Sequence, residues 1–232
     1  MSIRKILVTG ASSGIGEAIT DKLLSRGHTV YSLARRKVRR DNPRFQSFSI
    51  DLLDLDSLPD KLTPFLDVDT IICNAGKGYF GHLEQLSLSK IRSLIDLNFI
   101  SHVVIIKTLL PLLKKKPFSD IIFMGSEASL SGKKRGSVYC ASKFALRGFA
   151  QSLREECSQS SIRISTLLPG MVRTPFFETL DFMPGDESSH AILPEDIANM
   201  IITILDMRAE TFLDEIILSP KKKVIKSKNI IK

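Results

Sequence analysis

The sequence predicts an α/β fold: a doubly wound parallel sheet with helices on both faces. Short apolar segments rich in Ile, Val and Leu recur along the chain, and amphipathic segments separate them. A glycine-rich turn follows the first apolar segment. Strands that are covered on both faces carry such runs, and a repeated strand–helix–strand order builds a parallel sheet.

The elements follow this alternation from one end of the chain to the other. Strands are expected at residues 5–9, 29–34, 45–50, 70–73, 120–125, 163–168 and 215–219. Helices are expected at about residues 14–26, 54–66, 87–115, 137–158 and 194–207. A chain of 232 residues can bury a full core, so we expect a single domain over residues 1–218.

The net charge of +8 is concentrated at the end of the sequence. Residues 221–232 hold six lysines and no acid, and removing those six charges from +8 leaves +2. Residues 219–232 are therefore expected to form a basic, solvated and frayed tail, and deletion of residues 221–232 should leave any activity nearly unchanged. Weak contact with a polyanion or a membrane surface is the alternative, and no specific nucleic acid partner is expected.

Cysteine and histidine usage indicates a reducing compartment and no metal site. Three scattered cysteines are too few for a disulfide framework, and the four histidines lack paired acids at ligand spacing. His102 is expected to be a structural histidine. Lys107 and Pro111 interrupt the longest apolar stretch, so no membrane span is expected and a cytoplasmic protein is the default.

The segment TGASSGIG ends the first strand and opens the next helix. Glycine lets the backbone turn sharply and approach a pyrophosphate, which the free N–H groups of a helix N-terminus can bind. Thr9 can add a hydrogen bond. The residues expected to bind a dinucleotide here are Gly10, Ser12, Ser13, Gly14, Ile15 and Gly16.

The end of the second strand carries Arg35 and Arg36 and no acid. An acid at this place commonly holds the ribose of NAD, whereas an arginine suits a 2′-phosphate. We therefore predict NADP(H), with Arg35 as the phosphate ligand and Arg36 as the second candidate. Arg39 and Arg40, in the same loop, are expected to be solvated surface charges.

The next strand ends also carry polar or small residues. Asp51 can accept a hydrogen bond from the adenine amino group, with Leu52 against the ring. Asn74, Ala75 and Gly76 bring small residues and one amide to where the cofactor would pass. Because the carboxyl ends of parallel strands share one sheet edge, these residues are expected to lie together.

Tyr139 and Lys143 are four residues apart in the segment SVYCASKFAL and so should share one helix face. A nearby ammonium, joined by a cationic nicotinamide, favours the phenolate form of a tyrosine and would make it a better proton shuttle. A core tyrosine and a solvated lysine are the alternative. Val138, Ala141, Ala145 and Phe149 are expected to supply that helix with a separate apolar face for the sheet.

Taken together, these motifs resemble the short-chain dehydrogenase/reductase family over nearly all of residues 3–218, which implies a Rossmann-like fold. The matching pieces are TGASSGIG, Asp51, NAG at 74–76, Asn98 in LNF, Ser126 thirteen residues before Tyr139, YCASK at 139–143 and PGMVRT at 169–174.

The resemblance implies a role for each matching residue. Tyr139 would be the general acid/base, and Ser126 would hold the substrate oxygen. Lys143 would bind the nicotinamide ribose, and Asn98 would hold a water that links Lys143 to solvent. Pro169, Gly170, Val172 and Thr174 would lie at the nicotinamide.

The sequence therefore predicts an NADP(H)-dependent oxidoreductase that interconverts a carbonyl and an alcohol, with residues 176–190 as a mobile lid over an apolar substrate pocket. A non-catalytic dinucleotide-sensing or nucleic-acid-associated protein of the same fold is one alternative. Epimerisation or dehydration of a sugar nucleotide is another, disfavoured because no further substrate domain follows. The apolar segment FISHVVIIKTLLPLL predicts a homo-oligomer, a dimer or tetramer formed through the helices at about 98–115 and 137–158.

Overall fold

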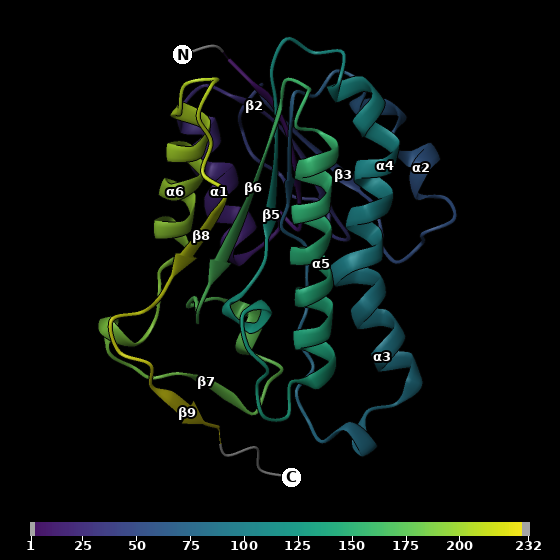
Figure 1. The fold of residues 1–232 in the computed structure, drawn as a ribbon. Helices are drawn as coiled ribbons and strands as arrows, with labels where there is room; N and C mark the ends of the chain where they lie inside the picture. Colours follow the sequence, from purple (N-terminus) through teal and green to yellow (C-terminus); the bar gives the residue numbers. More distant parts are fainter. Residues whose placement is uncertain (1–2, 229–232) are drawn as a thin grey trace.

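The computed structural model describes residues 3–228 and confirms the predicted doubly wound sheet (Figure 1). Seven parallel strands lie in the order β3-β2-β1-β4-β5-β6-β8. Their bounds are β1 Lys5–Thr9, β2 Thr29–Ala34, β3 Phe45–Ser49, β4 Thr70–Cys73, β5 Ser119–Met124, β6 Ile162–Pro169 and β8 Glu215–Leu218. The strand order reverses between β1 and β4, and a ligand site is expected at the carboxyl ends beside that point.

Helices cover both faces of the sheet because successive strand residues point to opposite sides. In β1, Ile6 and Val8 pack into the core on one face and Leu7 packs into the core on the other. The helices α1 Gly14–Ser25 and α6 Pro194–Asp206 cover the first face; α2 Leu58–Lys61, α3 Leu88–Ile95, α4 Ser101–Leu113 and α5 Ser137–Glu156 cover the second.

The helix predicted at 87–115 is continuous, but its winding changes from α-helical to π-helical and back to α-helical. A π-helical segment, Asp96–Ile100, joins α3 to α4. By length and composition the joined helix Leu88–Leu113 could cross a membrane. In this structure 39% of its apolar window is buried, and Ile105, Leu109 and Leu113 are fully buried against the sheet.

The helix predicted at 54–66 is wrong in extent. Only α2 is α-helical, and a 3₁₀ turn, Thr63–Phe65, follows it. Pro64 lies in that turn and has no N–H with which to continue an α-helical ladder.

A second, two-stranded sheet was not predicted. The strands β7 Phe182–Pro184 and β9 Ile225–Ser227 pair antiparallel beyond the carboxyl ends of the main sheet (Figure 1). The expectation of a frayed tail is therefore wrong for residues 221–228. Composition showed the charge of this segment but not the partners that order it.

Candidate active site

The glycine turn between β1 and α1 has the backbone that its sequence requires. Gly10 and Gly14 have φ of +67° and +59°, a region that side chains disfavour. A Cβ at Gly10 would lie 2.8 Å from the Cα of Ala75, and one at Gly16 would collide with the carbonyl oxygen of Gly10. The turn thus packs tightly against the segment that follows β4, where a side chain at Gly10 would not fit.

Thr9 joins the two strands at the switch point. Its hydroxyl oxygen accepts hydrogen bonds from the amides of Asn74 and Ala75, both at 2.9 Å, and the Asn74 side-chain amide donates to the Thr9 carbonyl at 3.0 Å. Thr9 is fully buried. It fixes the turn after β4, and the expectation that it hydrogen-bonds a cofactor is wrong.

Arg35 and Arg36 follow β2 directly, and both are exposed. The Arg35 carbonyl accepts a hydrogen bond from the Ser49 hydroxyl at 2.9 Å, which ties this end of β2 to β3. Both guanidinium groups lie at the strand end where a 2′-phosphate was expected.

Arg40, in contrast, is not a solvated charge as predicted. Its guanidinium pairs with Asp21 and, at 3.8 Å, with Glu17, both on α1, and lies 5.5 Å from the centre of the Phe45 ring. Its side chain is only 18% exposed. Arg40 therefore fastens the loop after β2 to α1, while Arg39 is exposed as predicted.

The end of β3 places Asp51 at the surface and Leu52 in the core. An Asp51 carboxylate oxygen accepts a hydrogen bond from the Leu53 amide at 3.0 Å. Lys77, which the sequence did not single out, belongs to the same neighbourhood. Burial, followed by the charge of Arg35, lowers the pKa of Lys77, and the charge of Asp51 opposes this shift.

Asn98 lies in the π-helical segment and is fully buried. Its side-chain oxygen accepts from the Lys77 amide at 2.9 Å, and its side-chain nitrogen donates to the Lys77 carbonyl at 3.0 Å and the Ser142 hydroxyl at 3.1 Å. A Cβ at Gly76 would lie 3.3 Å from the Asn98 side-chain oxygen and 3.6 Å from the Lys143 Nζ. The segment after β4 is thereby fixed close to Lys143.

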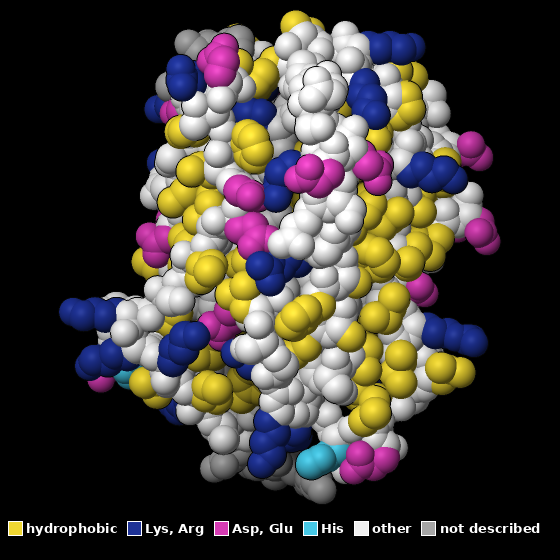
Figure 2. All heavy atoms as spheres, viewed as in Figure 1, with side chains coloured by type: hydrophobic (Ala, Val, Ile, Leu, Met, Phe, Trp, Pro, Cys, Tyr) yellow, Lys and Arg dark blue, Asp and Glu magenta, His cyan; other side chains and the backbone are white. Residues whose placement is uncertain are grey.

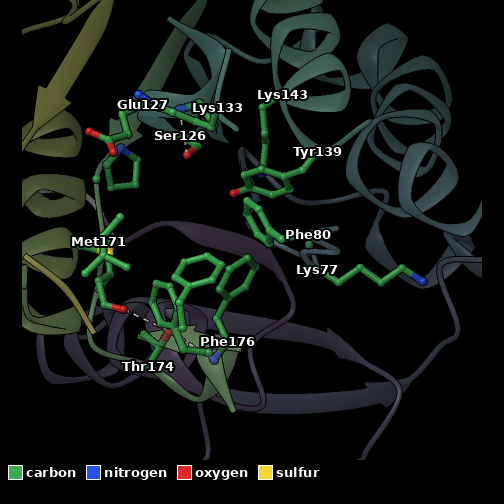
Figure 3. Close-up of a pocket in the computed structure, with 18 of the residues that line it drawn as sticks. Lys77, Phe80, Ser126, Glu127, Lys133, Tyr139, Lys143, Met171, Thr174 and Phe176 are labelled. Carbon is green, nitrogen blue, oxygen red and sulfur yellow. Dashed lines mark hydrogen bonds between the residues drawn. The ribbon is translucent and has the colours of Figure 1, made fainter. Parts of the chain in front are cut away.

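Ser126 and the pair on α5 converge on one cavity (Figure 3). Ser126 follows β5 and caps a 3₁₀ turn, Glu127–Ser129, by accepting a hydrogen bond from the Ala128 amide at 3.1 Å. Lys143 donates from Nζ to the Met124 carbonyl at 2.9 Å, at the end of β5. The Tyr139 ring projects into the cavity with its hydroxyl foremost (Figure 3).

The face of α5 that carries this pair is the face that packs on the protein. Tyr139, Lys143 and Leu146 are buried, whereas Ala141 is exposed and Val138 is only half-buried. The predicted separate apolar face is therefore wrong at Ala141, but Phe149 does pack on the sheet, with its ring 5.9 Å from the ring of Phe123 on β5. Lys143 is buried because its ammonium has the Met124 carbonyl as acceptor.

Burial dominates the acid–base properties of the pair. It raises the pKa of Tyr139 to about 12, and a hydrogen bond with Ser126 acts in the opposite direction. Burial also lowers the pKa of Lys143 to about 8. In the protein alone Tyr139 is therefore a neutral phenol at pH 7, and the predicted shift toward the phenolate, which requires a cationic nicotinamide as well as Lys143, stays a prediction.

We call residues 176–190 the flap. The cavity has a volume of about 550 Å³ and runs from the glycine turn to this flap. The predicted site residues that line the cavity are Ile15, Asn74, Gly76, Ser126, Tyr139, Lys143, Pro169, Gly170, Val172 and Thr174. Those that lie outside its lining are Gly10, Ser12, Ser13, Gly14, Gly16, Arg35, Arg36, Asp51, Leu52, Ala75 and Asn98.

This lining fits the nicotinamide half of a dinucleotide, while the residues expected at the adenosine half lie outside it. A ligand that enters at Ile15, beside the bare glycine backbone, can extend through the same cavity to Tyr139 and Lys143. A Cβ at Gly14 would lie 3.1 Å from the Cβ of Thr174, so the glycine turn also contacts the segment after β6.

Aromatic side chains form the far wall of the cavity. The Tyr139 ring lies 5.1 Å from the Phe80 ring and 6.1 Å from the Phe176 ring, measured between centroids, and Phe80 lies 5.0 Å from Phe182. Phe176 and Phe182 belong to the segment predicted as a lid over an apolar pocket, whereas Phe80 was not singled out. Its segment, KGYF, follows the NAG motif and has no periodicity that would have distinguished it.

His102 lies beneath the site and is fully buried, as predicted for a structural histidine. Its Nε2 hydrogen-bonds the Ala75 carbonyl at 2.9 Å. Burial lowers the pKa of His102 to about 4, so the ring is neutral at pH 7.

The comparison with known protein families identifies the class. The family model described as short chain dehydrogenase matches residues 4–183, and the chain belongs to this family of oxidoreductases. An uncharacterized oxidoreductase of Staphylococcus epidermidis is 27% identical over 224 residues, which is 92% of this chain and 96% of that protein.

Two relatives have more specific names. The NADP-dependent 3-hydroxy acid dehydrogenase of Schizosaccharomyces pombe is 29% identical, covering 94% of this chain and 92% of that one. The alcohol dehydrogenase of the archaeon Thermococcus sibiricus, solved with 5-hydroxy-NADP, is 25% identical with a TM-score of 0.83, covering 96% of this chain and 99% of that one.

Proposed function

We propose that the protein is an NADP(H)-dependent oxidoreductase that interconverts a carbonyl and an alcohol, with Tyr139 as the general acid/base. The observation that carries this proposal is the convergence of Ser126, Tyr139 and Lys143 on a cavity that also reaches the glycine turn. Names of relatives support it: one is called an NADP-dependent 3-hydroxy acid dehydrogenase, and another was solved with 5-hydroxy-NADP.

The nicotinamide cofactor, when bound, supplies or accepts the hydride. The glycine turn would hold its pyrophosphate, Arg35 or Arg36 its 2′-phosphate, and Lys143 the ribose nearest the reaction. Pro169, Gly170, Val172 and Thr174 would flank the nicotinamide, and Asp51 would accept a hydrogen bond from the adenine amino group, whereas the side chain of Leu52, expected against the adenine ring, is buried in the core.

Ser126 and Tyr139 act on the substrate oxygen. The Ser126 hydroxyl donates a hydrogen bond to the carbonyl oxygen and stabilises the negative charge that develops there. Tyr139 donates its proton to that oxygen during reduction. A pKa near 12 keeps the phenol protonated at pH 7, which is the form that reduction requires. Oxidation of an alcohol needs the deprotonated form and is favoured at higher pH.

The test is a panel of carbonyl compounds followed by NADPH absorbance, beginning with 3-oxo acids, simple ketones and aldehydes. We expect turnover of at least one of them. Tight NADPH binding without turnover of any carbonyl or alcohol would contradict the proposal and favour a dinucleotide-sensing protein of the same fold.

We also propose a homo-oligomer formed through α4 and α5. Phe144 on α5 is 44% exposed, and Val103, Val104 and Leu110 on α4 are only half-buried. Hydrophobic side chains gather over this side of the molecule (Figure 2). Light scattering should return a multiple of 25.9 kDa. A clean monomer at micromolar concentration would contradict this assembly.

Location in the cytoplasm is the last part of the proposal. All three cysteines are buried free thiols, which suits a reducing compartment.

A further inference from the structure

The last described segment of the chain lies across the flap. We call residues 220–228 the strap. In its strand β9, Ser227 pairs with Phe182, Lys226 with Met183 and Ile225 with Pro184, all in the flap strand β7. The pairing is antiparallel and lies apart from the main sheet (Figure 1).

Backbone hydrogen bonds fasten the strap to both ends of the flap. The Lys222 amide donates to the Ser189 carbonyl at 2.9 Å, the Gly185 amide donates to the Val224 carbonyl at 3.0 Å, and the Lys228 amide donates to the Asp181 carbonyl at 2.8 Å. The Lys228 ammonium also donates to the carbonyls of Phe177 and Glu178. The flap is therefore held along most of its length by one other segment.

The strap also contributes to the cavity itself. Lys223, Ile225 and Ser227 line the same cavity as Ser126 and Tyr139. The strap's partner strand reaches the catalytic tyrosine through rings, since Phe182 contacts Phe80 and Phe80 contacts Tyr139. The outer wall of the substrate side is thus shared between the flap and the strap.

One ion pair connects the strap to the catalytic strand end. The Lys223 ammonium pairs with the Glu127 carboxylate, and Glu127 follows Ser126 directly in the chain. Glu127 lies on the cavity wall near Ser126 (Figure 3). The Glu127 side chain is 21% exposed and that of Lys223 is 58% exposed. A pair with one exposed member is weak and can open without a large cost.

We infer that the strap closes the substrate pocket and that Lys223 is a positioning residue of the active site, acting through Glu127. When the Lys223–Glu127 pair opens, the strap and flap can move and admit substrate. When the pair forms again, it fixes the position of the cavity wall beside Ser126. The kinetic part of this inference rests on the proposed oxidoreductase function, whereas the structural part does not. It reverses the expectation that deleting residues 221–232 leaves turnover nearly unchanged.

Hydrogen exchange tests the structural part without any substrate. Deleting the residues after Pro220 should abolish the protection of the Gly185 amide and raise exchange throughout residues 182–190, while β1 and β4 stay protected. Lys223→Met should raise exchange in the flap less strongly, and it covers the case in which the shortened chain does not fold. If the folded Lys223→Met variant shows unchanged hydrogen exchange in the flap, the inference that the Lys223–Glu127 pair holds the strap closed is overturned.

Kinetics with a substrate from the carbonyl panel test the positioning role. Lys223→Met should raise KM for that substrate about two- to fivefold, the range expected of a partly exposed ion pair, with NADPH affinity unchanged. Lys223→Arg keeps the charge and should restore KM. Lys221→Met is the matched control, because Lys221 is exposed and makes no hydrogen bond or ion pair within residues 3–228.

Two outcomes would overturn the positioning role: an equal change in Lys221→Met, or KM unchanged in Lys223→Met. Failure of every carbonyl with the unmodified protein would instead count against the oxidoreductase proposal, and the exchange experiment would still decide the strap.

Discussion

The two sides of the cavity are held by different kinds of interaction. On the glycine-turn side, Thr9 and Asn98 are fully buried and bind backbone groups of the segment after β4. On the flap side, backbone hydrogen bonds from the strap are joined by the ion pairs Lys223–Glu127 and Lys226–Asp186, in which every side chain except that of Glu127 is more than half exposed. Buried hydrogen bonds keep one geometry, whereas exposed ion pairs exchange readily with water and salt. The difference indicates a fixed cofactor side and a substrate side that can open.

Removing the proposed proton donor, Tyr139, should have the largest effect. Tyr139→Phe keeps the ring between Phe80 and Phe176 but removes the transferable proton. Turnover should fall by about a hundred- to ten-thousandfold, while calorimetry should show unchanged NADPH affinity. Tyr79→Phe is the control, since it removes a phenol that does not line the cavity. Near-normal turnover of Tyr139→Phe would mean that this helix face is structural only.

The second largest effect should be on cofactor choice. The unmodified protein should bind NADPH more tightly than NADH by about ten- to hundredfold at low salt, because a guanidinium forms charge-assisted bonds to a phosphate. Arg35→Asp should reverse this order by removing that partner and adding an acceptor for ribose hydroxyls. Arg39→Asp, an exposed arginine in the same loop, is the matched control. Equal dissociation constants for the two cofactors in the unmodified protein would refute the assignment.

A smaller effect tests how firmly the fixed side is buried. The pKa of Lys143 is about 8 in the folded protein against 10.5 ordinarily, so the unfolded chain binds more protons between these values. Stability relative to Lys143→Met should therefore rise as pH rises from about 8 to 10, by at most about 3 kcal/mol. Urea denaturation at both pH values measures the difference.

Lys107→Met, at an exposed position on α4, is the control for that comparison and should show no such pH-dependent difference. A constant stability difference between the Lys143→Met variant and the unmodified protein across this pH range would show that Lys143 is more hydrated than the structure indicates.

Sequence reasoning found the fixed side well because its signals are local. Apolar runs predicted every strand of the main sheet, and motif residues at their carboxyl ends predicted most of the cavity lining on this side. Where local reasoning failed, a contact distant in sequence was decisive. Thr9, for example, was expected to hydrogen-bond a cofactor. Its partners in the structure are the amides of Asn74 and Ala75, which lie 65 and 66 residues further along the chain and leave no local pattern in the sequence.

The substrate side could not be predicted for the same reason. Lys223 and Glu127 are 96 residues apart, and a lysine-rich segment has the same composition whether it is solvated or ordered by pairing. β7 and β9 are three residues each, too short for an alternating pattern. The roles of the site residues stay predictions that the experiments above decide.

The position of the strap has a practical consequence for work with this protein. β9 lies beyond the carboxyl ends of the main sheet, next to the pocket, whereas β1 begins at the opposite edge (Figure 1). An affinity tag or reporter domain fused after β9 would lie next to the wall of the substrate pocket, whereas one fused before β1 would lie at the opposite edge of the sheet. Activity screens should therefore use N-terminal fusions, or a cleavable C-terminal tag removed before assay.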